Sequence, residues 1–216
     1  MTDVWSSRAE AFRQSPTHRE GPDLDLLIEM CEPAPGVKVL DVATGGGHVA
    51  RRLRDEGCTV ITVDPAPGMR PDVVAPAEHL PFEDGSFDVV TCRIAPHHFS
   101  DIRAAIAEMA RVSQRLVVIE DNLFVGEDAE EAERLRDPTH VRRYSEDEWK
   151  QMLTDVGLEV ERAEVMNRRA EVDEWLARVE TPPADAARVK ELLRDHIADG
   201  KITLPTILIR ARQSQR

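Results

Sequence analysis

The sequence predicts an α/β fold in which helices cover both faces of a mostly parallel sheet. An apolar run at residues 39–42 leads into three consecutive glycines, Gly45 to Gly47, and a helical pattern begins at His48. A second apolar run at residues 59–64 follows that helix, which gives the strand–turn–helix–strand order of a right-handed parallel unit. Apolar runs and amphipathic segments continue to alternate along the chain, which is typical of this fold class.

Seven apolar runs are predicted to be the strands of one sheet. They occupy residues 39–42, 59–64, 72–75, 87–93, 116–121, 158–165 and 202–210. The run at 87–93 is apolar enough for a central position, because a strand that is buried on both faces reads as a continuous apolar stretch.

Helices are predicted between these strands from apolar periodicity and from end signals. They occupy residues 23–31, 48–56, 101–112, 126–136, 146–156, 172–179 and 184–199. Gly57 and Gly157 each follow a helix, where glycine readily adopts the left-handed conformation of a C-cap. Ser145 and Glu148 have the spacing of a capping box. The acidic segment 126–136 is expected to be a solvated helix.

Composition and charge restrict the class of protein. The 216-residue chain suits one α/β domain and is short for two, so residues 1–216 are predicted to be a single domain. The net charge of −13 would repel a phosphate backbone on average, so we expect a small-molecule substrate and no nucleic-acid partner. No apolar run reaches the length of a membrane span, so no membrane partner and a cytoplasmic location are expected. The oligomeric state stays unknown at this stage.

The cysteines do not form a recognisable framework. Cys31, Cys58 and Cys92 are odd in number and scattered, and each lies in or beside an apolar segment. Buried free thiols are therefore predicted. No group of Cys and His residues has zinc spacing, so no metal site is predicted.

The glycine-rich turn predicts a ligand site at the end of the first strand. Gly45-x-Gly47-x-x-Ala50, with Asp64 at the end of the second strand, matches the dinucleotide pattern and admits an NAD(P)-binding oxidoreductase as one alternative. Asp41 argues against it, because a carboxylate there would lie close to an anionic pyrophosphate. The amino group and sulfonium of S-adenosylmethionine would instead be attracted to Asp41, and its ribose diol would suit Asp64.

At these residues the sequence resembles the class I S-adenosylmethionine-dependent methyltransferases, which have a Rossmann-like sheet. The segment Ala77-Glu-His-Leu-Pro-Phe-Glu-Asp-Gly-Ser-Phe-Asp88 resembles the branch that includes the ubiquinone/menaquinone-biosynthesis C-methyltransferases. The resemblance covers roughly residues 8–165 and implies that the last strand inserts antiparallel beside the fifth. It implies S-adenosylmethionine as cofactor, and cofactor contacts from Asp41, Ala43, Gly45, Gly47, Asp64, Pro65, Ala77, Glu78 and Arg93.

Three departures from the family pattern are evident. Residues 65–70 leave room for no more than one helical turn after Asp64. Pro76 replaces the usual acidic partner of adenine, so adenine recognition is expected to depend on Ala77, Glu78, Pro65 and Leu80. A turn of residues 113–115 replaces a Pro-Gly-Gly turn. These departures leave a non-catalytic S-adenosylmethionine-binding partner or regulatory protein as an alternative.

Histidines are the candidate bases, because transfer to a hydroxyl or an acidic C–H requires removal of a proton. His97 and His98 follow the fourth strand and His140 precedes the capped helix, and His98 and His140 are favoured. An acceptor with its own lone pair would need no base. Residues 1–22, with His18, are a possible lid, since they resemble segments that cover the cofactor in this branch. Residues 167–200 are predicted to be a helical appendage before the last strand.

Overall fold

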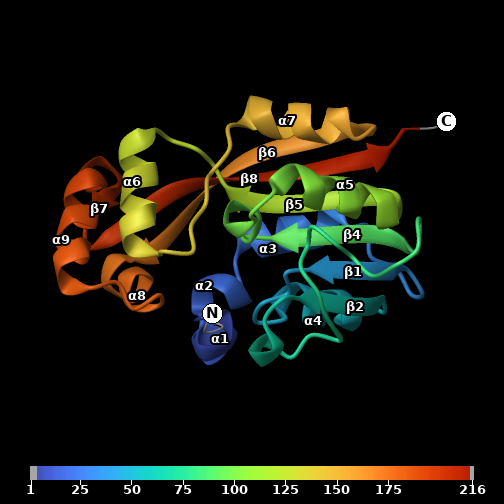
Figure 1. Ribbon diagram of the computed structural model, residues 1–216, viewed down its shortest axis with the longest axis horizontal. Helices are drawn as coiled ribbons and strands as arrows, with labels where there is room; N and C mark the ends of the chain where they lie inside the picture. The colour runs from blue at the N-terminus through green and yellow to red at the C-terminus, as the bar shows by residue number, and fades with distance from the viewer. Residues whose placement is uncertain (1–3, 215–216) are drawn as a thin grey trace.

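A single sheet organises the computed structural model, which describes residues 4–214 (Figure 1). Its strands follow the order β3-β2-β1-β4-β5-β8-β6, and β7 pairs with β8 outside this path. The strands are β1 Lys38–Val42, β2 Thr59–Asp64, β3 Val73–Val74, β4 Phe87–Arg93, β5 Ser113–Asn122, β6 Leu158–Glu171, β7 Ile197–Ala198 and β8 Lys201–Gln213. Strands β1 to β5 pair in parallel, and β8 runs antiparallel between β5 and β6. The predicted sheet and its antiparallel last strand are confirmed, whereas the two-residue β7 was not predicted.

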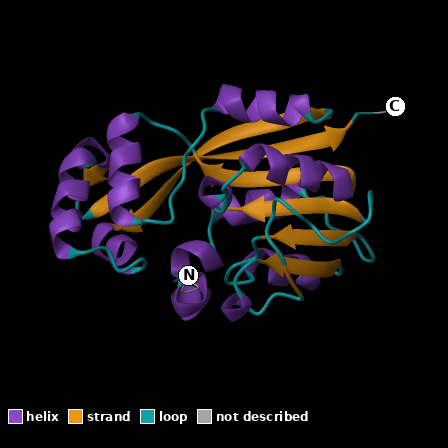
Figure 2. Ribbon diagram, in the orientation of Figure 1, coloured by secondary structure: helices purple, strands orange, loops and turns teal. Residues whose placement is uncertain are grey.

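Helices cover both faces of the sheet, as predicted (Figure 2). They are α1 Val4–Gln14, α2 Pro16–Arg19, α3 Pro22–Met30, α4 His48–Asp55, α5 Ile102–Val112, α6 Glu127–Arg136, α7 Glu146–Asp155, α8 Val172–Ala177 and α9 Pro183–Leu192. Successive side chains of a strand point to opposite faces, so Val39 lies in an apolar cluster with α3 and α4, and Leu40 lies in one with α5 and α7. Within residues 4–214, no helix is long and apolar enough to cross a membrane.

Local end signals are realised where the sequence indicates them. Ser145 Oγ accepts a hydrogen bond from Glu148 N, and the Glu148 side chain accepts one from Ser145 N, which completes the capping box of α7. Gly57 and Gly157 have φ angles of 86° and 82° after α4 and α7. Between β2 and β3 the chain makes only the short 3₁₀ turn Pro67–Met69, as predicted. Cys31, Cys58 and Cys92 are buried free thiols, again as predicted.

A third apolar cluster lies beyond one end of the main sheet, at the left of Figure 1. It joins α6, α8 and α9 to the far ends of β6 and β8, residues 167–171 and 201–205, which pair with each other. We call these elements together with β7 the distal lobe. The prediction that residues 167–200 are a helical appendage is wrong at both ends, because 167–171 continue β6 and 197–198 form β7. Polar side chains at 167–169 had obscured the strand.

Two further expectations are corrected. Residues 113–115 do not form a turn but begin β5, because Ser113 already pairs with Phe87 of β4. The acidic helix α6 is not simply solvated, since Glu130 and Glu133 are buried. Their burial depends on basic partners that follow in the chain.

Candidate active site

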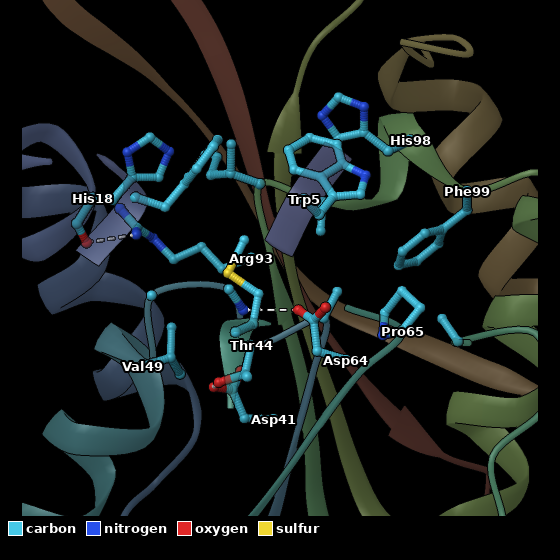
Figure 3. Close-up of a pocket in the computed structure, with 18 of the residues that line it drawn as sticks. Trp5, His18, Asp41, Thr44, Val49, Asp64, Pro65, Arg93, His98 and Phe99 are labelled. Carbon is cyan, nitrogen blue, oxygen red and sulfur yellow. Dashed lines mark hydrogen bonds between the residues drawn. The ribbon is translucent and has the colours of Figure 1, made fainter. Parts of the chain in front are cut away.

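A cavity of about 250 Å³ lies at the carboxyl ends of β1, β2 and β4 (Figure 3). We call it the strand-end cavity. It is lined by most of the predicted site residues: Asp41, Ala43, Gly45, Asp64, Pro65, Ala77, Glu78, Arg93 and His98. Open α/β sheets bind ligands at this edge, where neighbouring strands leave a crevice. Gly47, His97 and His140 do not line it.

The glycine-rich turn shapes one wall of the strand-end cavity. Ala43, Gly45 and Gly47 have positive φ angles of 53°, 51° and 74°. A Cβ on Gly46 would lie 2.7 Å from His48 Nε2 and 3.0 Å from the Phe12 carbonyl oxygen, so this position accepts only glycine without movement. Gly47 is the N-cap of α4 and does not line the cavity, so it contributes to the turn through its backbone conformation.

Asp41 is a buried carboxyl in the wall of this cavity. Thr44 Oγ1 donates a 2.6 Å hydrogen bond to Asp41 Oδ2, and no Lys, Arg or His of residues 4–214 forms an ion pair with this carboxyl. Burial raises the pKa of Asp41 to about 6, against the opposing effect of the Thr44 hydrogen bond. A ligand that brings a positive charge would therefore gain a partner here.

Two other acidic residues brace the walls through backbone groups. Asp64 accepts hydrogen bonds from Gly45 N at 3.0 Å and from Ala66 N at 2.9 Å. Glu78 Oε1 accepts from Ser100 N and Ser100 Oγ, both at 2.9 Å. Both carboxylates thus fix loops at the cavity edge, and both remain among its lining residues.

The surroundings of the strand-end cavity differ in part from the sequence-based expectation. Met69 lines it, although no sequence pattern indicated this residue, and so do Phe99 and Ser100 of the predicted loop after the fourth strand. Leu80, which was expected to contact adenine, is instead buried in the apolar cluster between the sheet and α5. Pro76, from which no adenine contact was expected, is absent from the lining residues.

The N-terminal helices form the wall opposite the strands. Trp5, Phe12 and His18 line the cavity from α1 and α2, and the Trp5 ring meets the His98 ring edge-on at 4.7 Å between centroids. His48 Nε2 donates a 3.0 Å hydrogen bond to the Phe12 carbonyl oxygen, which ties the end of α1 to the glycine-rich turn. Trp5 and Phe12 were missed at the sequence level, because a polar segment interrupted by Pro16 gave no apolar pattern.

Arg93 fastens this N-terminal segment to the sheet. Its Nη2 lies 2.5 Å from Asp23 Oδ2, its Nε lies 2.7 Å from Glu120 Oε2, and its Nη1 donates to the His18 carbonyl oxygen at 2.9 Å. The last bond is drawn in Figure 3. Arg93 lines the cavity, but its guanidinium donates on all three nitrogens to the protein itself, so its evident role is to position His18.

A second cavity of about 480 Å³ adjoins the first between α2 and the distal lobe. We call it the distal cavity. It shares four lining residues with the strand-end cavity: Phe12, His18, Ile94 and His98. A ligand in one cavity could therefore touch a ligand in the other at His98.

The three candidate histidines have different environments. His98 Nδ1 lies 3.1 Å from the Thr139 carbonyl oxygen, which can only accept, so Nδ1 carries the proton of the neutral ring and Nε2 has the free lone pair. Burial, followed by the neighbouring His97, lowers the pKa of His98 to about 3, so the ring is neutral at pH 7. His97 lines only the distal cavity, and its Nδ1 lies 2.5 Å from Asp121 Oδ1. His140 Nε2 is hydrogen-bonded to Glu130 Oε2 at 3.0 Å, and His140 lines neither cavity.

No metal centre is evident in the described part of the chain. Within residues 4–214, no group of three or more His, Cys, Asp or Glu side chains is arranged to hold a metal ion.

Comparison with known proteins places the chain in a family. Residues 40–116 match the model of a methyltransferase domain. The uncharacterised methyltransferase YcgJ of Bacillus subtilis (strain 168) is 33% identical over 220 residues, which is 90% of this chain and 85% of that protein. The crystal structure of the YcgJ protein has a TM-score of 0.79 and 28% identity, covering 89% of this chain and 98% of that one. A demethylmenaquinone methyltransferase of Beutenbergia cavernae is 41% identical over 99 residues, 40% of this chain and 41% of that protein. The chain therefore belongs to the class I methyltransferase family.

Proposed function

We propose that this enzyme transfers a methyl group from S-adenosylmethionine to a small-molecule acceptor. The observation that carries the proposal is Asp41, a buried carboxylate without a cationic partner among residues 4–214, in the wall of a cavity at the strand ends. A cationic ligand relieves the cost of burying that charge, whereas a dinucleotide brings an anionic pyrophosphate close to it. Family membership supports the same reaction class.

The residues of the strand-end cavity fit this cofactor. Asp41 would accept a hydrogen bond from its amino group, and Asp64, at the end of the neighbouring strand, would face its ribose diol. Glycine at 45, where φ is 51°, lets the turn take a left-handed conformation beside the ligand. When bound, the cofactor supplies a methyl group already activated by the sulfonium charge. The chain's own task is then to hold the acceptor in line and to exclude water.

His98 is the residue that we propose as the base for an acceptor that must lose a proton. It lies at the junction of the two cavities, and its Nε2 makes no hydrogen bond with another residue in the described range. The Thr139 carbonyl oxygen fixes the Nδ1 tautomer, so Nε2 is held ready to accept the acceptor's proton. Trp5 and Phe12 would exclude water from this junction.

Calorimetric titration tests the cofactor assignment. The purified protein is titrated with S-adenosylhomocysteine and with NADH, and the titrations are repeated on Asp41→Ala, Asp64→Ala and the exposed control Asp25→Ala. We expect binding of S-adenosylhomocysteine that both cavity variants weaken by about 100-fold and that the control leaves unchanged. Binding of NADH in its place would overturn the proposal, and so would full affinity in Asp41→Ala.

Steady-state kinetics test the base once release of S-adenosylhomocysteine has identified an acceptor. With a hydroxyl or C–H acceptor, His98→Gln is expected to lower kcat by about 10²- to 10⁴-fold while the affinity for S-adenosylhomocysteine changes by less than about threefold. An unchanged kcat with such an acceptor would show that another group takes the proton.

A further inference from the structure

The distal cavity contains more positive than negative charge, in a chain whose net charge is −13. Its three acidic lining residues all have basic partners, since Asp23 pairs with Arg93 and Arg168, Asp137 with Arg8, and Glu20 with Arg19. The local field inside this cavity is therefore opposite to the mean field of the molecule.

Arg178 is the side chain responsible for this excess. Of the four arginines that line the distal cavity, Arg168 and Arg136 pair with Asp23 and Glu133, and Arg169 is exposed. Arg178 is half-buried, and no carboxylate of residues 4–214 lies within ion-pair distance of it. Glu174 acts on it only at longer range. The one described hydrogen bond of its guanidinium is from Nη2 to Thr17 Oγ1, at 3.0 Å.

The positive charges around the distal cavity alter the pKa values of Arg178 and His18. Burial, Arg136 and Arg168 together lower the pKa of Arg178 to about 10. Burial, Arg168 and Arg178 also lower the pKa of His18, which lines both cavities. A half-buried guanidinium offers five N–H donors in a planar fork, and most of them here have no acceptor among residues 4–214. A bound anion would satisfy both the donors and the charge.

The rest of the distal cavity wall is largely apolar. Met166 of β6, Trp175 of α8 and Leu204 of β8 line it. Trp175 and Leu204 belong to the distal lobe, and Met166 directly precedes the part of β6 that does. An inorganic anion alone would leave this surface uncovered, whereas a ligand with an apolar body would cover it.

We propose that the methyl acceptor is a small organic anion, a carboxylate or a phosphate ester, whose anionic group is bound by Arg178 and whose apolar body packs against Met166, Trp175 and Leu204. This inference rests on the proposed function, because it assigns the distal cavity to the acceptor. It makes Arg178 a specificity-determining residue of that reaction. The reacting atom of the acceptor then lies toward His98, where the two cavities meet.

Titration of the full chain with three matched probes tests this inference. The probes are benzoate, phenyl phosphate and benzamide, which share one apolar ring and differ in charge, and they are added with and without saturating S-adenosylhomocysteine. We expect at least one anion to bind at least about tenfold more tightly than neutral benzamide. The preferred anion distinguishes a carboxylate from a phosphate acceptor. Equal affinity for all three, or no anion binding below about 10 mM, would overturn the inference.

Three variants locate the anion site. Arg178→Met is expected to weaken binding of the preferred anion by about tenfold, and Arg178→Lys, which keeps the charge but loses the planar fork, by a smaller factor. Arg134→Met removes the same charge from the exposed surface of α6 and should have no effect. Unchanged anion affinity in Arg178→Met, or an equal loss in Arg134→Met, would overturn the inference.

Binding of S-adenosylhomocysteine separates this inference from the proposed function. Arg178 does not line the strand-end cavity, so all three variants should bind S-adenosylhomocysteine as the unmodified protein does. If the unmodified protein does not bind S-adenosylhomocysteine, the proposed function is refuted. If it binds S-adenosylhomocysteine but does not distinguish the anions from benzamide, only the present inference is refuted.

Discussion

At the scale of single residues, Asp41 illustrates how a binding residue costs stability. Burial raises its pKa from the ordinary 3.8 to about 6, so the folded chain holds this proton more tightly than the unfolded chain does. The free energy of unfolding therefore falls as the pH rises from about 4 to about 6, and the cost reaches about 3 kcal/mol at pH 7. A cationic ligand would recover this free energy on binding, because it would stabilise the charged form of Asp41 in the folded protein.

Asp41→Asn is therefore expected to stabilise the ligand-free protein. The amide keeps an acceptor for Thr44 Oγ1 but carries no charge, so the free energy of unfolding should rise by about 1–3 kcal/mol at pH 7 and by much less at pH 4. Urea unfolding at the two pH values measures the difference, with the exposed Asp25→Asn as control. A gain of equal size at both pH values would show that the charge is not the cause.

At the scale of secondary structure, α7 depends on its capping box. Ser145→Ala removes the acceptor of the Glu148 N–H and is expected to lower the free energy of unfolding by about 1 kcal/mol. Ser145→Thr keeps that acceptor and should cost only a few tenths of a kcal/mol. Urea unfolding of the two variants checks this prediction, which fails if they are equally destabilised.

The helix α1 is hydrogen-bonded both beside the strand-end cavity and next to the distal lobe, a position that suits a lid. Ser6 Oγ accepts a 2.7 Å hydrogen bond from Gly68 N beside the strand-end cavity. On the other side, Arg8 donates to Asp137 Oδ1 at 3.2 Å and to the Val179 carbonyl oxygen at 2.8 Å, just after α6 and α8 of the distal lobe. Residues 1–3 of the expected lid, 1–22, lie outside the described range. The lid function of the segment remains our proposal.

Arg8→Met tests the lid by removing its attachment to the distal lobe. We expect the dissociation rate of S-adenosylhomocysteine to rise by about tenfold, because the lost hydrogen bonds hold α1 over the cavity. Stopped-flow measurement of dissociation gives the rate, and Arg19→Met on the exposed end of α2 is the control. If the rate stays unchanged in Arg8→Met, α1 is a fixed wall.

At the scale of the whole molecule, buried ion pairs join the distal lobe to the main sheet. Arg143, which is 1% exposed and precedes α7, has its Nη2 2.5 Å from Glu133 Oε1 on α6. Burial alone would raise the pKa of Glu133, but Arg136 and Arg143 overcome this effect and lower it to about 2. The carboxylate therefore contributes stability above its unfolded pKa of about 4.5, and that contribution is lost as the pH falls toward 2.

Removing one partner of this joint should be costly. Arg143→Met leaves Glu133 buried with a weaker set of partners and is expected to lower the free energy of unfolding by about 3–5 kcal/mol. The neighbouring Arg142 is exposed and pairs with Glu148 at the surface, so Arg142→Met should cost no more than about 1 kcal/mol. Denaturant unfolding of the two variants measures both costs. Equal costs would contradict a structural role for the ion pair between Arg143 and Glu133.

Much of the fold was predictable because its signals are local. The bounds of β2 and β4, the caps at Ser145, Gly57 and Gly157, and the single turn after Asp64 follow from short-range patterns. The far half of β6 was missed because most of its residues are polar and are held in the sheet by pairing with residues of β8 that lie thirty or more positions away. Pairing of that range leaves little trace in a local pattern.

The family, the glycine-rich turn and the carboxyls beside it could be predicted from the sequence, because each depends on residue types at fixed spacing. Which candidate histidine lies at the junction of the two cavities is visible only in the folded chain. It is His98, whereas His97 lines only the distal cavity and the equally plausible His140 is hydrogen-bonded to Glu130. Only the tertiary structure likewise left Arg178 without a carboxylate partner in the described range and buried Glu133 beside Arg143. Whether a charge is paired or free depends on segments that folding brings together, and no local pattern carries that information.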